Sequence, residues 1–150
     1  MGHHHAPRLF RSNQRVLETS GQLRLEYIES SGLTRWLATS FRNPIIIVSF
    51  GAPVSHSVPC PVITLDLPQL DGPSQLEVWS SDQPVTVHRA NEFSSAMSRD
   101  ILAISICLDE EPGGGLTKTT QQAYQLLLAQ LRELGFPYLW RIWNHFPRIN

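Results

Sequence analysis

The chain has 150 residues, is 41% hydrophobic and contains four Trp, six Phe and three Tyr, enough apolar surface for one folded domain. Its formal net charge of -1 provides no positive field to attract nucleic acid or anionic lipid, so neither is expected as a partner. No apolar run approaches the ~20 residues of a membrane-spanning helix, and Cys60 and Cys107 lack a zinc or disulfide spacing. We therefore predict a soluble, cytoplasmic protein without a metal or another cofactor.

The beginning of the chain carries no sustained hydrophobic period. Residues 1–20 are therefore predicted to form a flexible N-terminal arm, and residues 21–150 a single α+β domain. His3–His5 lie in this arm without partners at a fixed spacing, so they are interpreted as the remnant of an expression tag or as a frayed native terminus, and not as a metal site.

Several short segments have the patterns of β-strands. Residues 22–29 alternate apolar and polar side chains, which is typical of a half-buried strand, with Leu23, Leu25 and Tyr27 on one face. Other segments are β-branched runs or short apolar runs between Pro, Gly and Ser clusters. They predict strands over residues 45–48, 62–65, 76–79, 85–88 and 101–108, with 76–79 and 85–88 joined as a hairpin.

One long helix is predicted near the end of the chain. Thr119 is expected to cap its start together with Gln122, and Gly135 with Pro137 to end it. An apolar stripe at positions 123, 127, 131 and 134 should face a sheet. Together, these elements predict a two-layer α+β sandwich, with a mixed or antiparallel sheet and helices on one face.

Polar groups elsewhere do not combine into a known site. Gly113–Gly115 follow three acidic residues, so a phosphate cradle is not expected there. His56, His88 and His145 are isolated in the sequence, and residues 109–111 are interpreted as a solvated acidic loop. We assign no catalytic residue and no metal ligand.

The final segment combines aromatic and polar residues. Residues 138–146 are predicted to form a strand, which would place Trp140 and Ile142 on one face and Arg141 and Trp143 on the other. A guanidinium pairs bidentately with a carboxylate, so we take Arg141, Trp143 and Asn144 as candidate substrate-binding residues. The alternative is that Arg141 only pairs with a surface carboxylate and that Asn144 ends the strand.

This end of the chain resembles the chorismatases, enzymes that hydrolyse the enolpyruvyl ether of chorismate. The resemblance rests mainly on residues 134–137, running into Arg141-x-Trp143-Asn144 and on to Ile149-Asn150. Upstream, corresponding positions occur in the same order at residues 77–79, 83–85, Asn91 and the strand after Arg99-Asp100.

The resemblance implies a Rid-like fold that is duplicated in the family, with this chain as the N-terminal half. The family's catalytic residues lie beyond the matched stretch, so this chain is expected to be inactive alone and its parent to be the enzyme. The implied partners are chorismate, a C-terminal domain of the same chain and further copies of the protein. Chorismatases are more than twice this length, and Trp140, Trp143, Phe146 and Ile149 crowd the end, so the natural chain is expected to continue past Asn150.

Two alternatives of other classes stand beside this interpretation. One is a stand-alone Rid-type trimer that hydrolyses reactive imines with an Arg two residues after a Pro, whereas here Arg141 follows Pro137 by four residues. A β-bulge could restore the position of that side chain. The other alternative is a non-catalytic domain that associates through its sheet.

Overall fold

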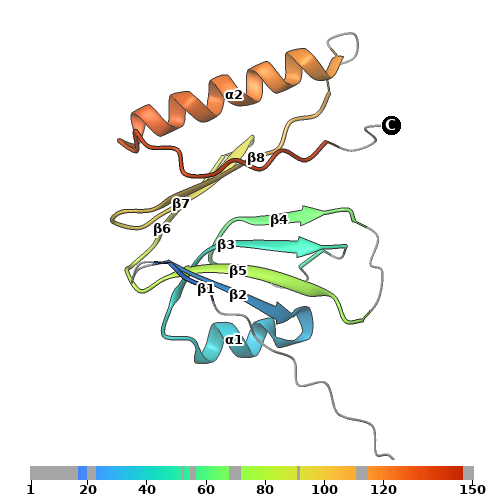
Figure 1. Cartoon of the computed structure of the whole chain (residues 1–150), viewed down its shortest axis with the longest axis vertical. Coiled ribbons are helices and arrows are strands. Elements are labelled where there is room, and N and C mark those ends of the chain that lie inside the picture. The colour runs from blue at the N-terminus through green and yellow to red at the C-terminus, as the bar shows by residue number, and fades with distance from the viewer. Residues whose placement is uncertain are drawn as a thin grey trace, which may run out of the picture.

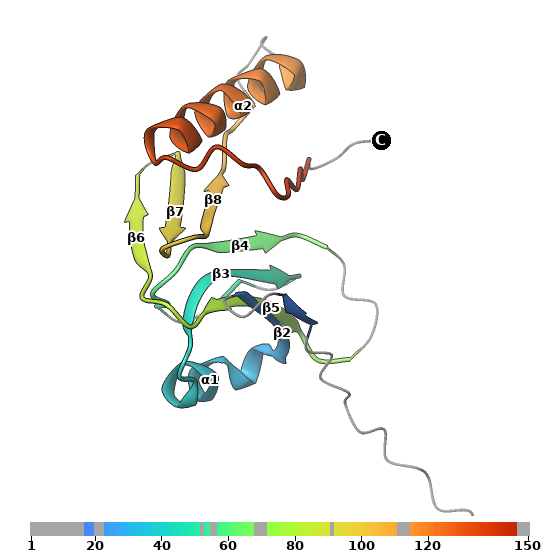
Figure 2. The same ribbon diagram turned by 60° about the vertical axis from the view of Figure 1, so that its left-hand side comes forward.

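The computed structural model describes residues 17–19, 23–51, 53–54, 57–67, 72–90, 92–110 and 115–146. It is an α+β structure with two sheets, each accompanied by one α-helix (Figure 1, Figure 2). Sheet A has the strand order β1-β2-β5-β3-β4, and sheet B has the order β6-β7-β8. The elements are β1 (Leu17–Thr19), β2 (Leu23–Glu29), a short 3-10 helix (Ser30–Gly32), α1 (Leu33–Thr39), β3 (Asn43–Phe50), β4 (Val62–Leu65), β5 (Gln75–Ser81), β6 (Thr86–Arg89), β7 (Phe93–Met97), β8 (Leu102–Ile106) and α2 (Gly115–Glu133).

Sheet A is mixed, as the sequence predicted. Strand β5 pairs antiparallel with β2 on one edge and with β3 on the other, while β3 and β4 run parallel. The β-branched run in β3 lies in the interior, with Ile45 and Ile47 almost completely buried. The strands predicted at 22–29, 45–48, 62–65, 76–79 and 101–108 are therefore confirmed as β2, β3, β4, β5 and β8.

The two faces of sheet A bury different clusters. On one face, called the helix face, Ile28, Leu76 and Val78 pack with Leu33 at the start of α1. On the other, called the cluster face, Leu25, Ile46 and Trp79 pack together, with Ala103 of β8 against them. Sheet B thus meets sheet A on its cluster face.

A second connection between the sheets runs through the arginine that ends β6. The Arg89 guanidinium donates hydrogen bonds of 3.0 Å to the carbonyls of Val58 and Cys60, which precede β4. Burial raises the pKa of the Cys60 thiol to about 12, an effect that the Arg89 charge partly opposes. Cys60 therefore stays protonated at neutral pH and serves as a small apolar core residue.

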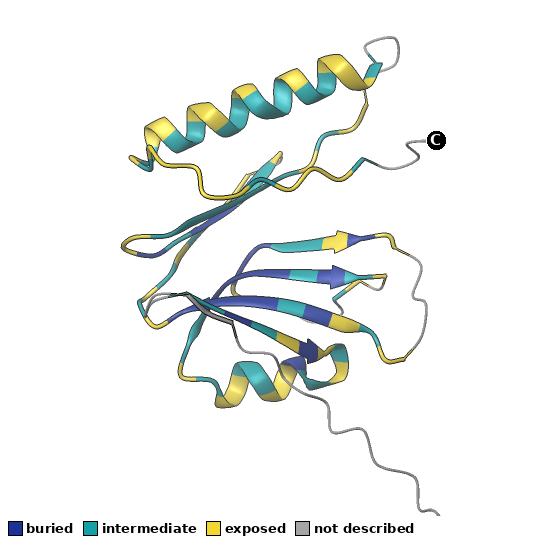
Figure 3. Cartoon of the chain, in the orientation of Figure 1, coloured by how far each residue is buried: buried dark blue, intermediate teal, exposed yellow. Residues whose placement is uncertain are grey.

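Helix α2 lies over sheet B (Figure 1). The predicted stripe at 123, 127, 131 and 134 is partly buried, and Figure 3 shows the partly buried residues on the side of α2 that faces sheet B. No residue of α2 is fully buried. The contact between α2 and sheet B is therefore less buried than the core that α1 forms with the strands of sheet A.

The end of α2 follows the prediction but its start does not. Gly135 has φ +76, its N–H bonds the Arg132 carbonyl and the Phe136 N–H bonds the Leu131 carbonyl, which is a Schellman motif. At the other end the helix begins at Gly115, so the predicted Thr119 cap is wrong. The Thr119 hydroxyl instead donates to the Gly115 carbonyl inside the first turn, at 3.5 Å.

Two further predictions about strands are wrong. The segments 76–79 and 85–88 do not form a hairpin, because both edges of β5 are taken by β2 and β3, and β6 pairs with β7 in the other sheet. Residues 138–146 are not a strand, although the alternation is present. Strands β1 and β7 and helix α1 were not predicted, and β1 lies within the stretch expected to be an arm. The helices accompany two separate sheets and do not share one face of a single sheet.

Candidate functional site

The irregular segment 136–146, called the C-terminal segment, runs back from α2 between that helix and sheet A (Figure 1, Figure 2). Asn144 fixes it to α2, because its side-chain amide donates a 2.9 Å hydrogen bond to the Tyr124 hydroxyl. At its other attachment the segment rests on Trp79, on the cluster face of sheet A. Side chains and not a β-ladder therefore hold this segment in place.

Three tryptophans and one arginine form the second attachment, called the tryptophan–arginine cluster. The ring centroids of Trp140 and Trp143 lie 6.0 and 5.9 Å from that of Trp79, both in edge-to-face geometry. The central carbon of the Arg141 guanidinium lies 5.7 Å from the Trp140 ring and 5.3 Å from the Trp143 ring. Both distances are within the range of cation–π attraction. Because residues three apart meet the same ring, Trp140 and Trp143 do not lie on opposite faces as the strand prediction had it.

No described residue uses the hydrogen-bond donors of Arg141. Its side chain is exposed, and it donates no hydrogen bond and forms no ion pair with any residue in the described part of the chain. A guanidinium carries five N–H groups in a fixed fork that matches a carboxylate. Stacking on tryptophan orients that fork without occupying it, which is a suitable arrangement for binding an anionic ligand.

A carboxylate lies beneath this cluster and is already occupied by neutral donors. The Tyr27 hydroxyl donates to Glu77 Oε2 at 2.9 Å, and the Trp79 indole N–H donates to Glu77 Oε1. Glu77 forms no ion pair within the described residues, which leaves Arg141 available. Desolvation is the largest cause that raises the pKa of Tyr27, and the hydrogen bond and negative charge of Glu77 raise it further. The positive charge of Arg141 lowers this pKa. Tyr27 thus lies within electrostatic reach of both charged groups.

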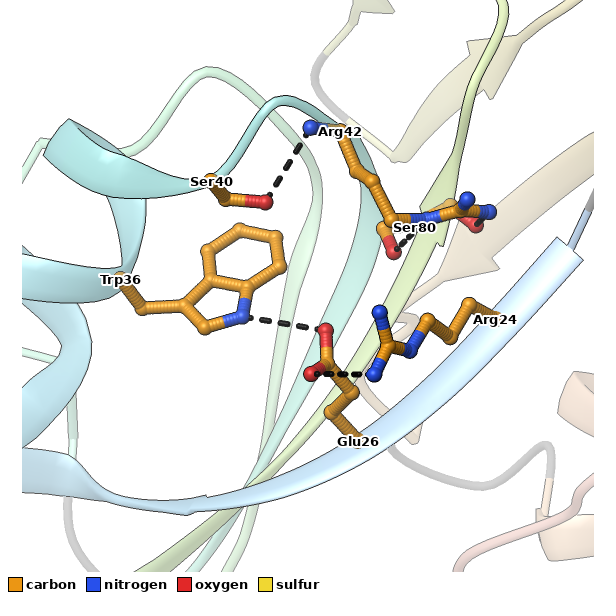
Figure 4. A network of polar contacts seen from close by, with 6 residues as sticks. All are labelled: Arg24, Glu26, Trp36, Ser40, Arg42 and Ser80. Atoms are coloured by element: carbon orange, nitrogen blue, oxygen red, sulfur yellow. Dashed lines mark hydrogen bonds and ion pairs between the residues drawn. The ribbon is translucent and has the colours of Figure 1, made fainter. Parts of the chain in front are cut away.

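The other arginines near sheet A are engaged in the structure itself (Figure 4). On the helix face, Arg24 lies 3.5 Å from Glu26, which also accepts a 3.1 Å hydrogen bond from the Trp36 indole. Arg42 donates to the hydroxyl and the carbonyl of Ser80, at 3.1 and 3.2 Å. These groups stabilise the packing of α1 and are not candidates for a ligand site.

The structure also places the remaining polar residues that the sequence singled out. His88 and His145 are exposed, and neither forms an ion pair with an acidic side chain of the described residues. No group of His, Cys, Asp or Glu that could hold a metal ion occurs in the residues searched, which are the described ones. In the same part of the chain, no helix combines the length and the hydrophobicity needed to cross a membrane. Several positions lie outside the described residues: His3–His5, His56, Asn91, Glu111, Gly113, Gly114, Ile149 and Asn150.

Of the predicted binding residues, Arg141 and Trp143 come together, while Asn144 is directed to α2. Sequence reasoning missed Tyr27, Glu77, Trp79 and Trp140 as members of the site. A signal for the first three exists in the alternation of β2 and β5, which places 25 and 27 on one face and 77 and 79 on one face. The sequence pattern does not contain the pairing of β2 with β5. Only this pairing places Tyr27 opposite Glu77 and Leu25 opposite Trp79.

Comparison with known proteins agrees with the resemblance. Residues 77–150 match the family described as chorismatase FkbO/Hyg5-like, N-terminal. No curated protein matches the chain. The matched stretch begins at Glu77 and contains the whole tryptophan–arginine cluster and Asn144. Over these residues the chain is similar to the N-terminal domain of the FkbO/Hyg5-like chorismatases.

Proposed function

We propose that this chain is the N-terminal domain of a protein that hydrolyses the enolpyruvyl ether of chorismate, that it has the Rid-like fold of that family, and that it is inactive alone. The family match supports the class of protein. The Arg141 guanidinium has no ion-pair partner among the described residues, which supports the ligand class, because chorismate is a carboxylate-bearing ring. In this proposal Arg141 binds a carboxylate of chorismate, Trp143 lies beside the ring, and Asn144 holds the C-terminal segment in position through Tyr124.

Hydrolysis of an enol ether needs a proton donor and an activated water molecule. Neither described histidine has the acidic partner that would make it a general base of the usual kind. A partner domain that supplies these groups, and a cytoplasmic setting in the biosynthesis of aromatic acids for secondary metabolism, are parts of the same proposal. Homo-oligomerisation is compatible with it.

The first experiment measures pyruvate release from chorismate with a coupled dehydrogenase. Residues 1–150 alone should release pyruvate no faster than buffer. In the protein that joins this domain to its catalytic partner, Arg141→Ala should lower kcat/KM at least about tenfold, the cost of a lost charge-assisted hydrogen bond. The matched control is Arg35→Ala, since Arg35 is an exposed arginine on α1.

Two results would contradict the proposal. Pyruvate release by residues 1–150 at an enzymatic rate would show that the site is complete within this chain. Equal kcat/KM for Arg141→Ala, Arg35→Ala and the parent protein would show that Arg141 does not bind the substrate.

The Rid-type imine hydrolase is the alternative from another class. In this alternative, a bulge in a strand would bring the Arg141 side chain to the position expected two residues after a Pro. Residues 138–146, however, form no strand. It would be favoured by a trimer that hydrolyses imines and loses that activity in Arg141→Ala. A chain that associates through its sheet without turning over any substrate would instead favour the non-catalytic binding domain.

A further inference from the structure

The cluster face of sheet A offers hydrogen-bond acceptors beside the unused donors of Arg141. Tyr27 and Glu77 are directly opposite each other in the β2–β5 ladder, and Trp79 follows two residues after Glu77 on the same face. The Tyr27 side chain is 42% exposed, so its hydroxyl is accessible although it donates to Glu77. A ligand held by Arg141 would therefore meet a phenol and a carboxylate.

These two groups still have capacity for a hydrogen bond. A phenol oxygen that donates can also accept, and each carboxylate oxygen accepts more than one donor. Glu77 Oε2 receives one donor from Tyr27 and Oε1 one from Trp79. Tyr27 and Glu77 can thus accept a hydrogen bond from a ligand, whereas Arg141 can only donate hydrogen bonds. The site consequently has a side suited to a carboxylate and a side suited to a hydroxyl group.

The charge on Glu77 makes the second side selective. A negatively charged group placed there would be repelled, while a hydroxyl group would gain an acceptor. Trp79 joins the two sides: its indole N–H donates to Glu77, and its ring contacts Trp140 and Trp143, on which Arg141 stacks. An aromatic wall for that ring is provided by Trp143 beside Arg141.

We propose that Tyr27 and Glu77 determine the specificity of the Arg141 site. They select a cyclic carboxylate that carries a hydroxyl group on its ring. Ligands with a hydrogen atom or a second carboxylate in place of that hydroxyl group bind less tightly. This inference rests on the proposed carboxylate binding by Arg141. It adds a role for Tyr27, which lies outside the stretch that matches the family.

The test uses residues 1–150 with isotope-labelled tryptophan and follows the four indole N–H signals by NMR during titration. The ligands are benzoate, its 3- and 4-hydroxy isomers, and the dicarboxylates isophthalate and terephthalate. Signals of Trp79, Trp140 and Trp143 should shift. The Trp36 signal should not, because that indole is bonded to Glu26 on the opposite face of the sheet.

At least one hydroxybenzoate should bind about fivefold or more tighter than benzoate, the gain of one neutral hydrogen bond of about 1 kcal/mol. The dicarboxylates should bind no tighter than benzoate. In Tyr27→Phe the ratio of hydroxybenzoate to benzoate affinity should fall to about one, and Glu77→Gln should reduce it and admit the dicarboxylates. The ratio should be unchanged in Tyr138→Phe, at a fully accessible phenol, and in Glu26→Gln on the helix face.

The outcomes separate this inference from the proposed function. Absence of any shift in the three cluster indoles, or unchanged binding in Arg141→Gln, would overturn both. Loss of binding in Arg141→Gln together with a full hydroxyl preference in Tyr27→Phe would overturn only the specificity role. In every variant except Glu26→Gln, which changes the acceptor of the Trp36 indole, an unchanged Trp36 signal shows that sheet A is intact.

Discussion

The two faces of sheet A are built from the same kinds of residues and use them differently. On the helix face the Trp36 indole donates to Glu26, and Glu26 also pairs with Arg24. On the cluster face the Trp79 indole donates to Glu77, but the second donor to that carboxylate is the Tyr27 hydroxyl. The arginine of the cluster face, Arg141, is stacked on tryptophan rings instead.

The partner of the carboxylate decides what the arginine can do. When a guanidinium pairs with a carboxylate of the same chain, as Arg24 does with Glu26, the ion pair holds both side chains in the packed structure. When neutral donors satisfy the carboxylate, the nearby guanidinium keeps its own donors for a ligand. Of the two Trp–Glu–Arg groups, the one without an ion pair among the described residues is therefore the candidate for ligand binding.

The largest difference between the faces should appear in folding stability. Leu76 is 1% exposed in the helix-face core, so Leu76→Ala should lower the free energy of unfolding by about 2–5 kcal/mol. Trp143 is 53% exposed, so Trp143→Ala should cost about 1 kcal/mol, the scale of its aromatic and cation–π contacts. Urea denaturation measures both values, and an equal loss in the two variants would contradict the division into a core face and a recognition face.

A smaller difference is expected between the two carboxylates. In Glu26→Gln the amide N–H₂ would face either the Trp36 indole or Arg24, both of which are donors, so we expect a loss of about 1–2 kcal/mol in this partly exposed network. In Glu77→Gln the Tyr27 hydroxyl can turn and accept, so the loss should stay below about 0.5 kcal/mol, the usual range for surface substitutions. The same denaturation experiment tests this pair, and a more destabilising Glu77→Gln would show that Glu77 is mainly structural.

The smallest effect concerns the pKa of Tyr27, which can be followed through its ring signals by NMR. Removing the positive charge in Arg141→Gln should raise this pKa further, and removing the negative charge in Glu77→Gln should lower it. Since the folded-state pKa lies above the ordinary value of 10.0, the contribution of Tyr27 to stability is complete below pH 10 and is lost as the pH rises through the folded-state value. Shifts of the same sign in the two variants would mean that Tyr27 does not lie within reach of both charges.

The resemblance to the chorismatases, which rests mainly on residues 134–150, was visible in the sequence, and the family match over 77–150 confirms it. The carboxylate-binding role of Arg141 remains a prediction, now supported by its free donors. The conformation around Arg141 was predicted wrongly, because alternation states which side chains could share a face but not whether the segment pairs with another strand. Residues 138–146 instead remain irregular and are held by Trp79 and Tyr124.

The sequence by itself determined the features that depend on near neighbours along the chain. The strand Val62–Leu65 and the end of α2 at Gly135 follow from β-branched side chains and from the tolerance of glycine for positive φ. Only the tertiary structure decided the site, since Tyr27 and Glu77 are 50 residues apart and meet through the pairing of β2 with β5. Each strand can pair with any other strand of the chain, so a local sequence pattern does not determine which two strands become neighbours.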